Sequence, residues 1–258
     1  MRKYSYSFLK TALLPAELLS VTNALSELKV QASARKENYP RIFAGLEGVA
    51  RVQSVKSSNA IEGIVTSDAR IREIVTKSCA PLSHSEMEIA GYRDALNMIH
   101  KGHEHLDFRE ADILELHRVL LSYTPQGGGT YKVRDNLIID VNMDGTRSVR
   151  FTPVSASETA AAMNQITLAY MEARDDAGIN QLLLIPCVIL DFLCIHPFAD
   201  GNGRMSRLMS LLLMYRNGLD AGKYTSFEEQ INNSKGAYYS ALSDSSAGWL
   251  SCSIQVLV

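Results

Sequence analysis

The chain has 258 residues, 46% of them hydrophobic, and its 28 acidic and 26 basic residues leave a net charge of −2 at pH 7. This length and composition suit one large domain, or one core with a smaller attached lobe, and exclude a disordered chain. A nearly neutral protein has no overall positive field to attract nucleic acid, so nucleic-acid binding is not expected.

Four cysteines are scattered along the chain without a close pair, which fits neither a disulfide framework nor a zinc site and is typical of a reducing compartment. The first 20 residues carry several charges and no long apolar run, so no secretory signal is expected. The most apolar stretch, 181–195, contains Pro186 and Asp191 and falls short of the roughly 20 apolar residues that span a bilayer. We therefore expect a cytoplasmic protein without a membrane span, and a buried helix over this stretch.

Helical spacing of apolar residues recurs along most of the chain. Ser85 is placed to cap one helix, and Gly63 and Gly218 are placed to end two others. The pattern predicts helices over 47–62, 85–100, 110–123, 156–173, 181–196, 203–217 and 224–244.

The region 127–154 differs from the rest because its apolar residues fall in short runs. Leu137–Ile139 and Val149–Phe151 read as strands, and Asp144-Gly145 between them is a strong hairpin turn signal. Since an isolated hairpin is only marginally stable, we expect it to rest on the helices, where it can serve as a flap over a site.

The segment from His196 to Arg207 combines several features of a reactive site. His196 precedes Pro197, and a residue before proline is pushed out of the helical region, so a buried helix should end at the histidine. The negative end of the helix dipole favours the protonated imidazole, and we expect it to raise the basicity of His196. A histidine so placed suits a general base.

Polar residues after His196 form a candidate anion site. Gly201 and Gly203 allow backbone N–H groups to point into one concavity at the start of the next helix. Arg204 and Arg207 share a face of that helix, where a multiply charged anion such as a polyphosphate would offset their charges. Asp200, an oxygen ligand beside this site, could hold Mg²⁺ together with phosphate oxygens.

Each of these features alone has an ordinary structural explanation. Gly201-Asn202-Gly203 is a common turn sequence, a lone histidine is more often structural, and a single arginine is usually a solvated surface residue. The conjunction of base, metal ligand, anion site and two arginines in one short segment favours a site that handles phosphate.

The whole segment His196–Arg207 resembles the Fic family signature, His-x-Phe-x-Asp/Glu-Gly-Asn-Gly-Arg-x-x-Arg, at every defined position. The resemblance implies a mainly α fold, a Fic-type helical bundle with one β-hairpin flap and an N-terminal helical lobe. It divides the chain into an N-terminal helical lobe at 1–84, a Fic catalytic core at 85–247, and an atypical, truncated or altered tail at 248–258. That tail departs from the usual continuation of the family, which puts DNA binding in doubt.

The family resemblance also implies an activity, the transfer of AMP from ATP to a Ser, Thr or Tyr hydroxyl of a target protein. His196 would then deprotonate the hydroxyl, and Asp200 would hold Mg²⁺ between the α- and β-phosphates. The residues that it assigns to the phosphates are Gly201, Asn202 and Gly203 as a cradle, Arg204 on the β-phosphate and Arg207 on the γ-phosphate.

Two further stretches resemble parts of Fic proteins. Residues 129–132 and 136–139 resemble the flap, which implies that a target protein docks along 136–154 by strand addition and that Ile138 and Ile139 contact the nucleotide. The match departs at Lys132, where relatives often have arginine, and at Ile139 and Asp140, where they often have glycine. Tyr238-Tyr239 resembles a tyrosine pair that lines the adenine pocket, although packing alone would also explain such a pair.

The residues from Ser58 to Gly63 resemble the family's inhibitory motif, Ser/Thr-x-x-x-Glu-Gly/Asn. The resemblance implies that Glu62 pairs with Arg207 in the place of the γ-phosphate, so that ATP binds in an orientation that does not react. The alternative makes Glu62 a solvated residue near a helix end capped by Gly63.

Three other functions stay open at this point. The same site could remove AMP from a modified target, with Glu62 orienting a water molecule. It could transfer the γ-phosphate, as in the Doc-like branch, although that branch usually has lysine where this chain has Gly203. The chain could also be a non-catalytic nucleotide-binding partner sensor, which the intact signature argues against. The resemblance finally implies a homodimer.

Overall fold

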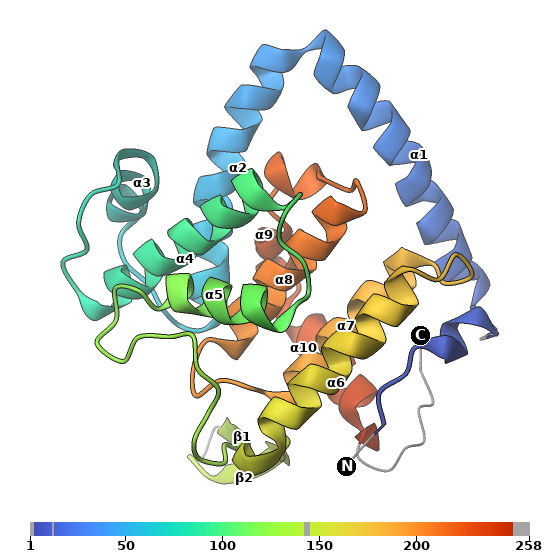
Figure 1. Cartoon of the computed structure of the whole chain (residues 1–258). Coiled ribbons are helices and arrows are strands. Elements are labelled where there is room, and N and C mark those ends of the chain that lie inside the picture. Colours follow the sequence, from blue (N-terminus) through green and yellow to red (C-terminus); the bar gives the residue numbers. More distant parts are fainter. Residues whose placement is uncertain (1–2, 12, 142–144, 250–258) are drawn as a thin grey trace.

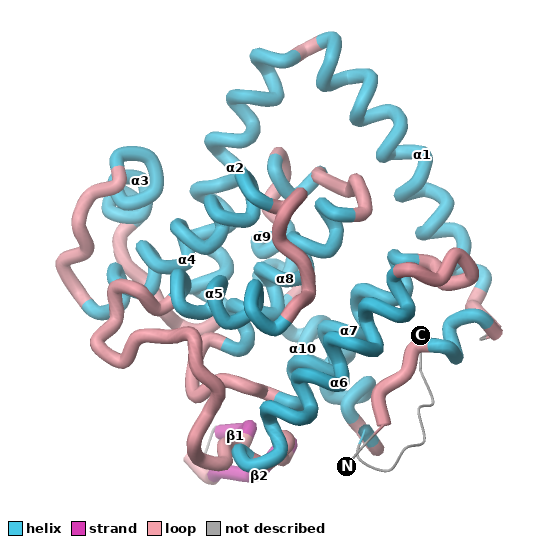
Figure 2. The backbone as a smooth tube through the Cα atoms, viewed as in Figure 1, coloured by secondary structure: helices cyan, strands magenta, loops and turns pink. Residues whose placement is uncertain are grey.

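The computed structural model describes residues 3–11, 13–141 and 145–249, which are mainly helical with one two-stranded sheet (Figures 1 and 2). The predicted mainly α class with a single hairpin is confirmed within these residues. In chain order the elements are the 3-10 turn Ser7–Lys10, α1 (Ala16–Asn38), α2 (Pro40–Ile61), α3 (Asp68–Lys77), α4 (His84–Gly102), α5 (Glu110–Leu120), β1 (Ile138–Val141), β2 (Arg147–Phe151), α6 (Ala156–Arg174), α7 (Gln181–Ile195), α8 (Asn202–Arg216), the 3-10 turn Ala221–Lys223, α9 (Phe227–Asn233) and α10 (Lys235–Ser246).

Helices α1 and α2 form an arch above the rest of the molecule (Figure 1). The arch breaks at Tyr39, whose backbone leaves the helical region (φ −131°, ψ 54°) because Pro40 follows it. Lys29 ties α1 to the body by donating from Nζ to the carbonyl oxygen of Asn217 at 2.8 Å.

The second half of α2 descends from the arch into the body, where it packs against α3, α4 and α9. The helix ends at Ile61, Glu62 caps it, and Gly63 follows with φ +77°, a left-handed conformation that favours glycine. Glu62 is thereby placed at the tip of α2. The buried residues that anchor this half of α2 are Ala50, Ser54, Val55, Ser57, Ser58, Asn59 and Ile61.

Helices α7 and α8 form the centre of the body, with α6 packed on α7 and α4 packed on α8 (Figure 1). A helix that is apolar on nearly every face, as α7 is, must be buried. Phe192 of α7 and Leu208 of α8 are fully buried members of one continuous core. The short loop between these two helices, 196–201, is therefore held at both ends by the core.

The predicted hairpin is present as β1 and β2, which pair antiparallel with Ile138 opposite Phe151 and Ile139 opposite Val149. Gly145 after the turn has φ +81°. Asp144, the other half of the expected turn signal, lies outside the described residues. The hairpin lies beside the start of α6 (Figure 2).

Three details of the predicted helices are wrong. The expected helix over 224–244 is two helices, α9 and α10, which meet at Ser234. Helix α5 ends at Leu120, so Tyr123 lies in the following turn. The cap of α4 is Ser83, whose Oγ accepts from the N–H of Glu86 at 3.3 Å, because α4 begins before Ser85.

The start of the tail packs on the core. Trp249 is buried, and its Nε1 donates to Asp191 Oδ1 at 2.6 Å, while the hydroxyl of Tyr6 donates to Oδ2 of the same carboxylate at 3.0 Å. The remainder of the atypical tail, 250–258, lies outside the described residues. Among the helices described, none combines the length and apolar character that a bilayer crossing requires. The boundaries 1–84 and 85–247 stay predictions.

Candidate active site

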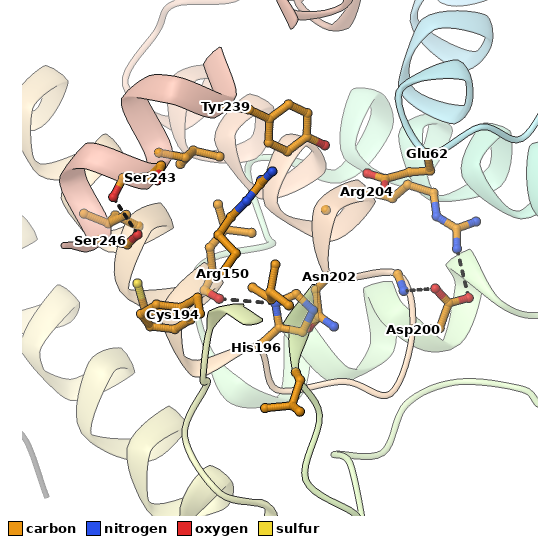
Figure 3. Close-up of a pocket in the computed structure, with 18 of the residues that line it drawn as sticks. Glu62, Arg150, Cys194, His196, Asp200, Asn202, Arg204, Tyr239, Ser243 and Ser246 are labelled. Atoms are coloured by element: carbon orange, nitrogen blue, oxygen red, sulfur yellow. Dashed lines mark hydrogen bonds and ion pairs between the residues drawn. The ribbon is translucent and has the colours of Figure 1, made fainter. Parts of the chain in front are cut away.

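A cavity of about 560 Å³ lies where the α7–α8 loop, the hairpin, α10 and the tip of α2 meet (Figure 3). It brings together residues that are far apart in the sequence. Its lining includes Glu62, Glu88, Ile138, Arg150, His196, Asp200, Gly201, Asn202, Gly203, Arg204 and Tyr239.

His196 ends α7 in a left-handed conformation (φ 51°, ψ 60°), which non-glycine residues adopt only where the surroundings impose it. Its Nδ1 lies 3.2 Å from the carbonyl oxygen of Leu193. A carbonyl only accepts, so Nδ1 carries the proton and Nε2 carries the free lone pair. The tautomer therefore leaves Nε2 able to accept a proton.

The expectation that the helix dipole raises the basicity of His196 is wrong. Burial lowers the pKa of His196 below its usual value, and the positive charge of Lys132 lowers it further. The Leu193 carbonyl and the carboxylates of Glu62 and Asp200 oppose this shift, but burial is the largest cause. The imidazole is consequently neutral at pH 7, which is the form that a general base requires.

Asp200 presents an exposed carboxylate to the cavity, with 69% of its side chain accessible. Its Oδ1 accepts from the N–H of Gly201 at 2.6 Å, and its Oδ2 accepts from Arg204 Nη2 at 3.1 Å (Figure 3). No group of three or more His, Cys, Asp or Glu side chains suited to a metal occurs among the described residues. A single carboxylate nevertheless fits Mg²⁺, which commonly takes one or two carboxylates and completes its shell with water and phosphate oxygens.

The side chain of Asn202 shapes the loop. Its Oδ1 accepts from the N–H of Phe198 at 3.0 Å, and its Nδ2 donates to the carbonyl oxygen of Phe198 at 2.8 Å. The amide therefore closes the turn, and the part of Asn202 that is left for an anion is its backbone N–H at the start of α8.

Arg204 lies in the first turn of α8 and only 2% of its side chain is exposed. Its Nη1 is 2.6 Å from Glu88 Oε2, an ion pair that is not aligned as a hydrogen bond, and its Nε is buried without a hydrogen-bond partner among the described residues. A buried guanidinium with donors to spare in a cavity wall fits an anionic ligand.

Arg207, one turn further along α8, donates from Nε and Nη2 to the end of α2. Its Nε donates to Ser58 Oγ at 2.8 Å, and its Nη2 donates to the Ser58 carbonyl at 3.0 Å and to Glu62 Oε1 at 2.8 Å. A Cβ on Gly203 would lie 2.3 Å from Glu62 Oε1, so the carboxylate rests against the first turn of α8. Glu62 lines the cavity and stands between it and Arg207.

The predicted flap and tyrosine residues lie in different surroundings. Ile138 lines the cavity, whereas Ile139 is 44% exposed and is not among the lining residues described. Tyr239 also lines the cavity, but Tyr238 faces a separate apolar groove beneath α1. The two rings are 5.6 Å apart at 77°, so they do not form one flat surface.

His117 of α5 contacts the loop of the site, although no motif in the sequence marks it. Its ring stacks on Phe198 at 3.6 Å, its Nδ1 accepts from the N–H of Gly129 at 2.9 Å, and its Nε2 lies 3.1 Å from the carbonyl oxygen of Asp200. Burial lowers the pKa of His117 to about 4. The one sequence signal was the glycine cluster: a Cβ on Gly128 would lie 2.4 Å from the His117 carbonyl oxygen.

Lys132 and Asn136 join the base of the hairpin to the same loop. Lys132 donates from its backbone N–H to the Pro197 carbonyl at 2.8 Å and from Nζ to the Ile195 carbonyl at 3.1 Å. Asn136 Oδ1 accepts from the same Nζ at 2.7 Å, and its Nδ2 donates to the Phe198 carbonyl at 3.1 Å. Burial lowers the pKa of Lys132 to about 8. Lysine therefore fills the place where arginine is frequent with a specific set of contacts.

Comparison with known proteins shows which proteins this chain resembles. A model of the Fic/DOC family matches residues 107–214. A protein of Nematostella vectensis named protein adenylyltransferase Fic is 27% identical over 177 residues, which is 66% of this chain and 38% of that protein. A protein of Caenorhabditis elegans named protein adenylyltransferase fic-1 is 28% identical over 166 residues, 62% of this chain and 30% of the relative. The match thus spans only about a third of these relatives.

Solved structures share the fold. A Fic family protein from Desulfovibrio desulfuricans superposes with a TM-score of 0.74 at 21% identity, over 92% of this chain and 68% of that one. A Fic domain containing signaling protein from Bacteroides thetaiotaomicron gives 0.66 at 22% identity, over 83% and 80%. Residues 107–214 therefore match the Fic/DOC family, and the chain shares its fold with Fic proteins of known structure.

Proposed function

We propose that this protein transfers AMP from ATP to a Ser, Thr or Tyr hydroxyl of a target protein, and that Glu62 inhibits this activity. The observation that carries the proposal is one cavity that joins a neutral His196, the exposed carboxylate of Asp200 and the N-terminus of α8, with Glu62 bound to Arg207 at its edge. The names of the relatives, protein adenylyltransferase, support the same reaction class.

In the proposed reaction Nε2 of His196 takes the proton of the target hydroxyl. The hydroxyl oxygen forms a bond to the α-phosphorus as the bond from that phosphorus to the β-bridging oxygen breaks, and pyrophosphate leaves. Burial keeps the imidazole neutral, and the Leu193 carbonyl keeps its other nitrogen protonated, so the base is ready before substrate arrives.

The chain's other residues position charge. Asp200 is placed to hold Mg²⁺, which when bound would neutralise charge on the α- and β-phosphates. The guanidinium of Arg204, which lines the cavity, and the N–H groups at the start of α8 would bind phosphate oxygens. Fixed donors aimed at developing charge are the main contribution of proteins to phosphoryl-type transfer.

Glu62 supplies the inhibition. Its carboxylate lies at the N-terminus of α8 against Gly203 and on Arg207, a place where an anionic γ-phosphate would otherwise find a helix N-terminus and an arginine. A γ-phosphate in the place of the Glu62 carboxylate would be repelled by that carboxylate, so ATP must either displace Glu62 or bind with its γ-phosphate elsewhere. The second outcome turns the α-phosphate away from attack.

A target protein would dock along the hairpin, 136–154. Large apolar side chains are exposed there at Leu137, Ile139 and Val149, and a two-stranded sheet leaves strand edges able to accept another strand. The homodimer that the family resemblance implies and the cytoplasmic location that the sequence implies also remain proposals.

The test measures the transfer of label from α-labelled ATP to proteins of a cell lysate and to the protein itself. We expect Glu62→Gly to label proteins more than the parent does, and Glu62→Gly with His196→Ala to lose the labelling. Label from γ-labelled ATP and none from α-labelled ATP would instead show phosphotransfer. Release of AMP from a labelled target by the parent protein would show the reverse reaction, and nucleotide binding without either reaction would show a sensor.

A further inference from the structure

We propose that His117 is a positioning residue that keeps the N–H of Gly201 turned toward the cavity, where it binds a phosphate oxygen of the nucleotide. The inference rests on the proposed function, because it takes a nucleotide as the ligand, and it extends the site to a residue outside the 196–207 segment.

The contacts of His117 fix its tautomer. The N–H of Gly129 can only donate, so Nδ1 of His117 accepts at 2.9 Å and the single proton of the neutral ring sits on Nε2. Nε2 therefore donates to the carbonyl oxygen of Asp200, 3.1 Å away. With its face stacked on Phe198 and its side chain buried, the ring cannot turn without losing three contacts.

The hydrogen bond to Asp200 determines which way Gly201 points. The carbonyl of Asp200 and the N–H of Gly201 belong to one peptide, and the described residues contain no cis peptide bond, so the two groups point in opposite directions. Since the carbonyl faces His117, the N–H faces the other side. There it donates to Oδ1 of Asp200 at 2.6 Å, an acceptor that a phosphate oxygen would replace, and both residues line the cavity (Figure 3).

Gly201 makes such a restraint necessary. It caps α8 with φ +82°, and without a Cβ it adopts either hand of backbone conformation readily. Rotation of this one peptide would replace an N–H by a carbonyl oxygen at the helix N-terminus, and a carbonyl oxygen repels phosphate where an N–H binds it. His117 selects the orientation that binds.

The experiment measures the dissociation constant of ADP by calorimetry in EDTA. ADP is the probe because it lacks the γ-phosphate that competes with Glu62, and EDTA removes the contribution of metal at Asp200. His117→Phe keeps a ring on Phe198 and removes both hydrogen bonds, so we expect the constant to rise about tenfold, the effect of losing one hydrogen bond to a charged group. His117→Gln, whose amide can still donate toward Asp200, should recover part of the affinity.

His100→Phe is the matched control, since His100 is another largely buried histidine with a lowered pKa, on α4, whose contacts are with Tyr215 and not with the loop. It should leave the ADP constant unchanged. A folded His117→Phe that binds ADP as the parent does would overturn the inference, whereas a parent that binds ADP neither in EDTA nor with Mg²⁺ would overturn the proposed function itself.

A second measurement on the unaltered protein covers the case in which His117→Phe does not fold. In glycine-labelled protein, the amide resonance of Gly201 should shift on addition of ADP more than those of Gly127 and Gly145, which lie outside the α8 terminus. An unchanged Gly201 resonance under saturating ADP would also overturn the inference.

Discussion

Arg204 and Arg207 lie one turn apart on α8 and are equally buried, yet their surroundings differ. Arg204 pairs with Glu88 and Asp200 and keeps a buried Nε without a hydrogen-bond partner among the described residues. Arg207 has aligned hydrogen bonds to Ser58 and Glu62. In the proposed anion site, the end at Arg204 is therefore left for a ligand, while the end at Arg207 is occupied by the protein's own carboxylate.

The largest effect should come from the substitution of Arg204. In the Glu62→Gly background we expect Arg204→Ala to reduce transfer of α-label about 10²- to 10³-fold, since it removes a fixed charge beside the phosphates that react. Arg207→Ala should cost about tenfold or less, because its proposed ligand, the γ-phosphate, lies one phosphate further from the reacting α-phosphorus than the β-phosphate does. Initial rates at saturating ATP give the comparison, and equal losses for the two variants would contradict it.

Lys235 offers a way to loosen the closed end without touching Glu62. Its Nζ donates to the Ile61 carbonyl at 2.6 Å, and so holds the end of α2 from which Glu62 projects. We expect Lys235→Met to raise labelling by the otherwise unaltered protein about two- to fivefold, because one part-buried hydrogen bond contributes about 1 kcal/mol. Lys235→Arg should behave as the parent.

The background makes this test specific. Once Glu62→Gly has removed the carboxylate, Lys235→Met has nothing left to release and should change the rate little. A similar increase in both backgrounds would mean that Lys235 acts on something other than Glu62.

The pH profile of the reaction tests His196 as the proposed base. Burial holds the pKa of His196 below its usual 6.5, and only the neutral imidazole accepts a proton. Activity of the Glu62→Gly form should therefore persist through pH 6.5 and fall as pH drops through the lowered pKa. A profile that already halves above pH 6.5 would show that the helix dipole, and not burial, dominates at His196.

An effect on stability, and not on rate, is expected at Ser58, whose Oγ accepts a hydrogen bond from Arg207. Ser58→Ala leaves a buried Nε of Arg207 without an acceptor, which should lower the free energy of unfolding by about 1–3 kcal/mol. The control is Ser57→Ala, because Ser57 is a buried neighbour whose side chain has no hydrogen bond described in the structure. Urea denaturation measures both, and equal losses would mean that the Arg207 contact adds nothing.

The contiguous part of this site could be predicted from the sequence because its geometry is local. His196 must end a helix before Pro197, and Gly201 and Gly203 must open the next one, so motif and backbone agree within 12 residues. The mainly α class and the hairpin followed likewise from local periodicity and turn chemistry.

The remainder depends on tertiary packing that no local pattern encodes. His117, Glu88 and Lys132 reach the loop from α5, α4 and the base of the hairpin, and each looks like an ordinary helix or turn residue in the sequence. The lowered pKa of His196 is not predictable from the sequence for the same reason, since a helix end can be recognised in the sequence and the depth of burial cannot.

The comparison of the two arginines is tested most directly by the affinities of ATP and ADP, measured by calorimetry on the parent protein and on Glu62→Gly. If Glu62 occupies the place of the γ-phosphate, Glu62→Gly should bind ATP more tightly than the parent does, while the dissociation constant of ADP, which has no γ-phosphate, stays the same. Equal changes for both nucleotides, or no change for ATP, would contradict the account.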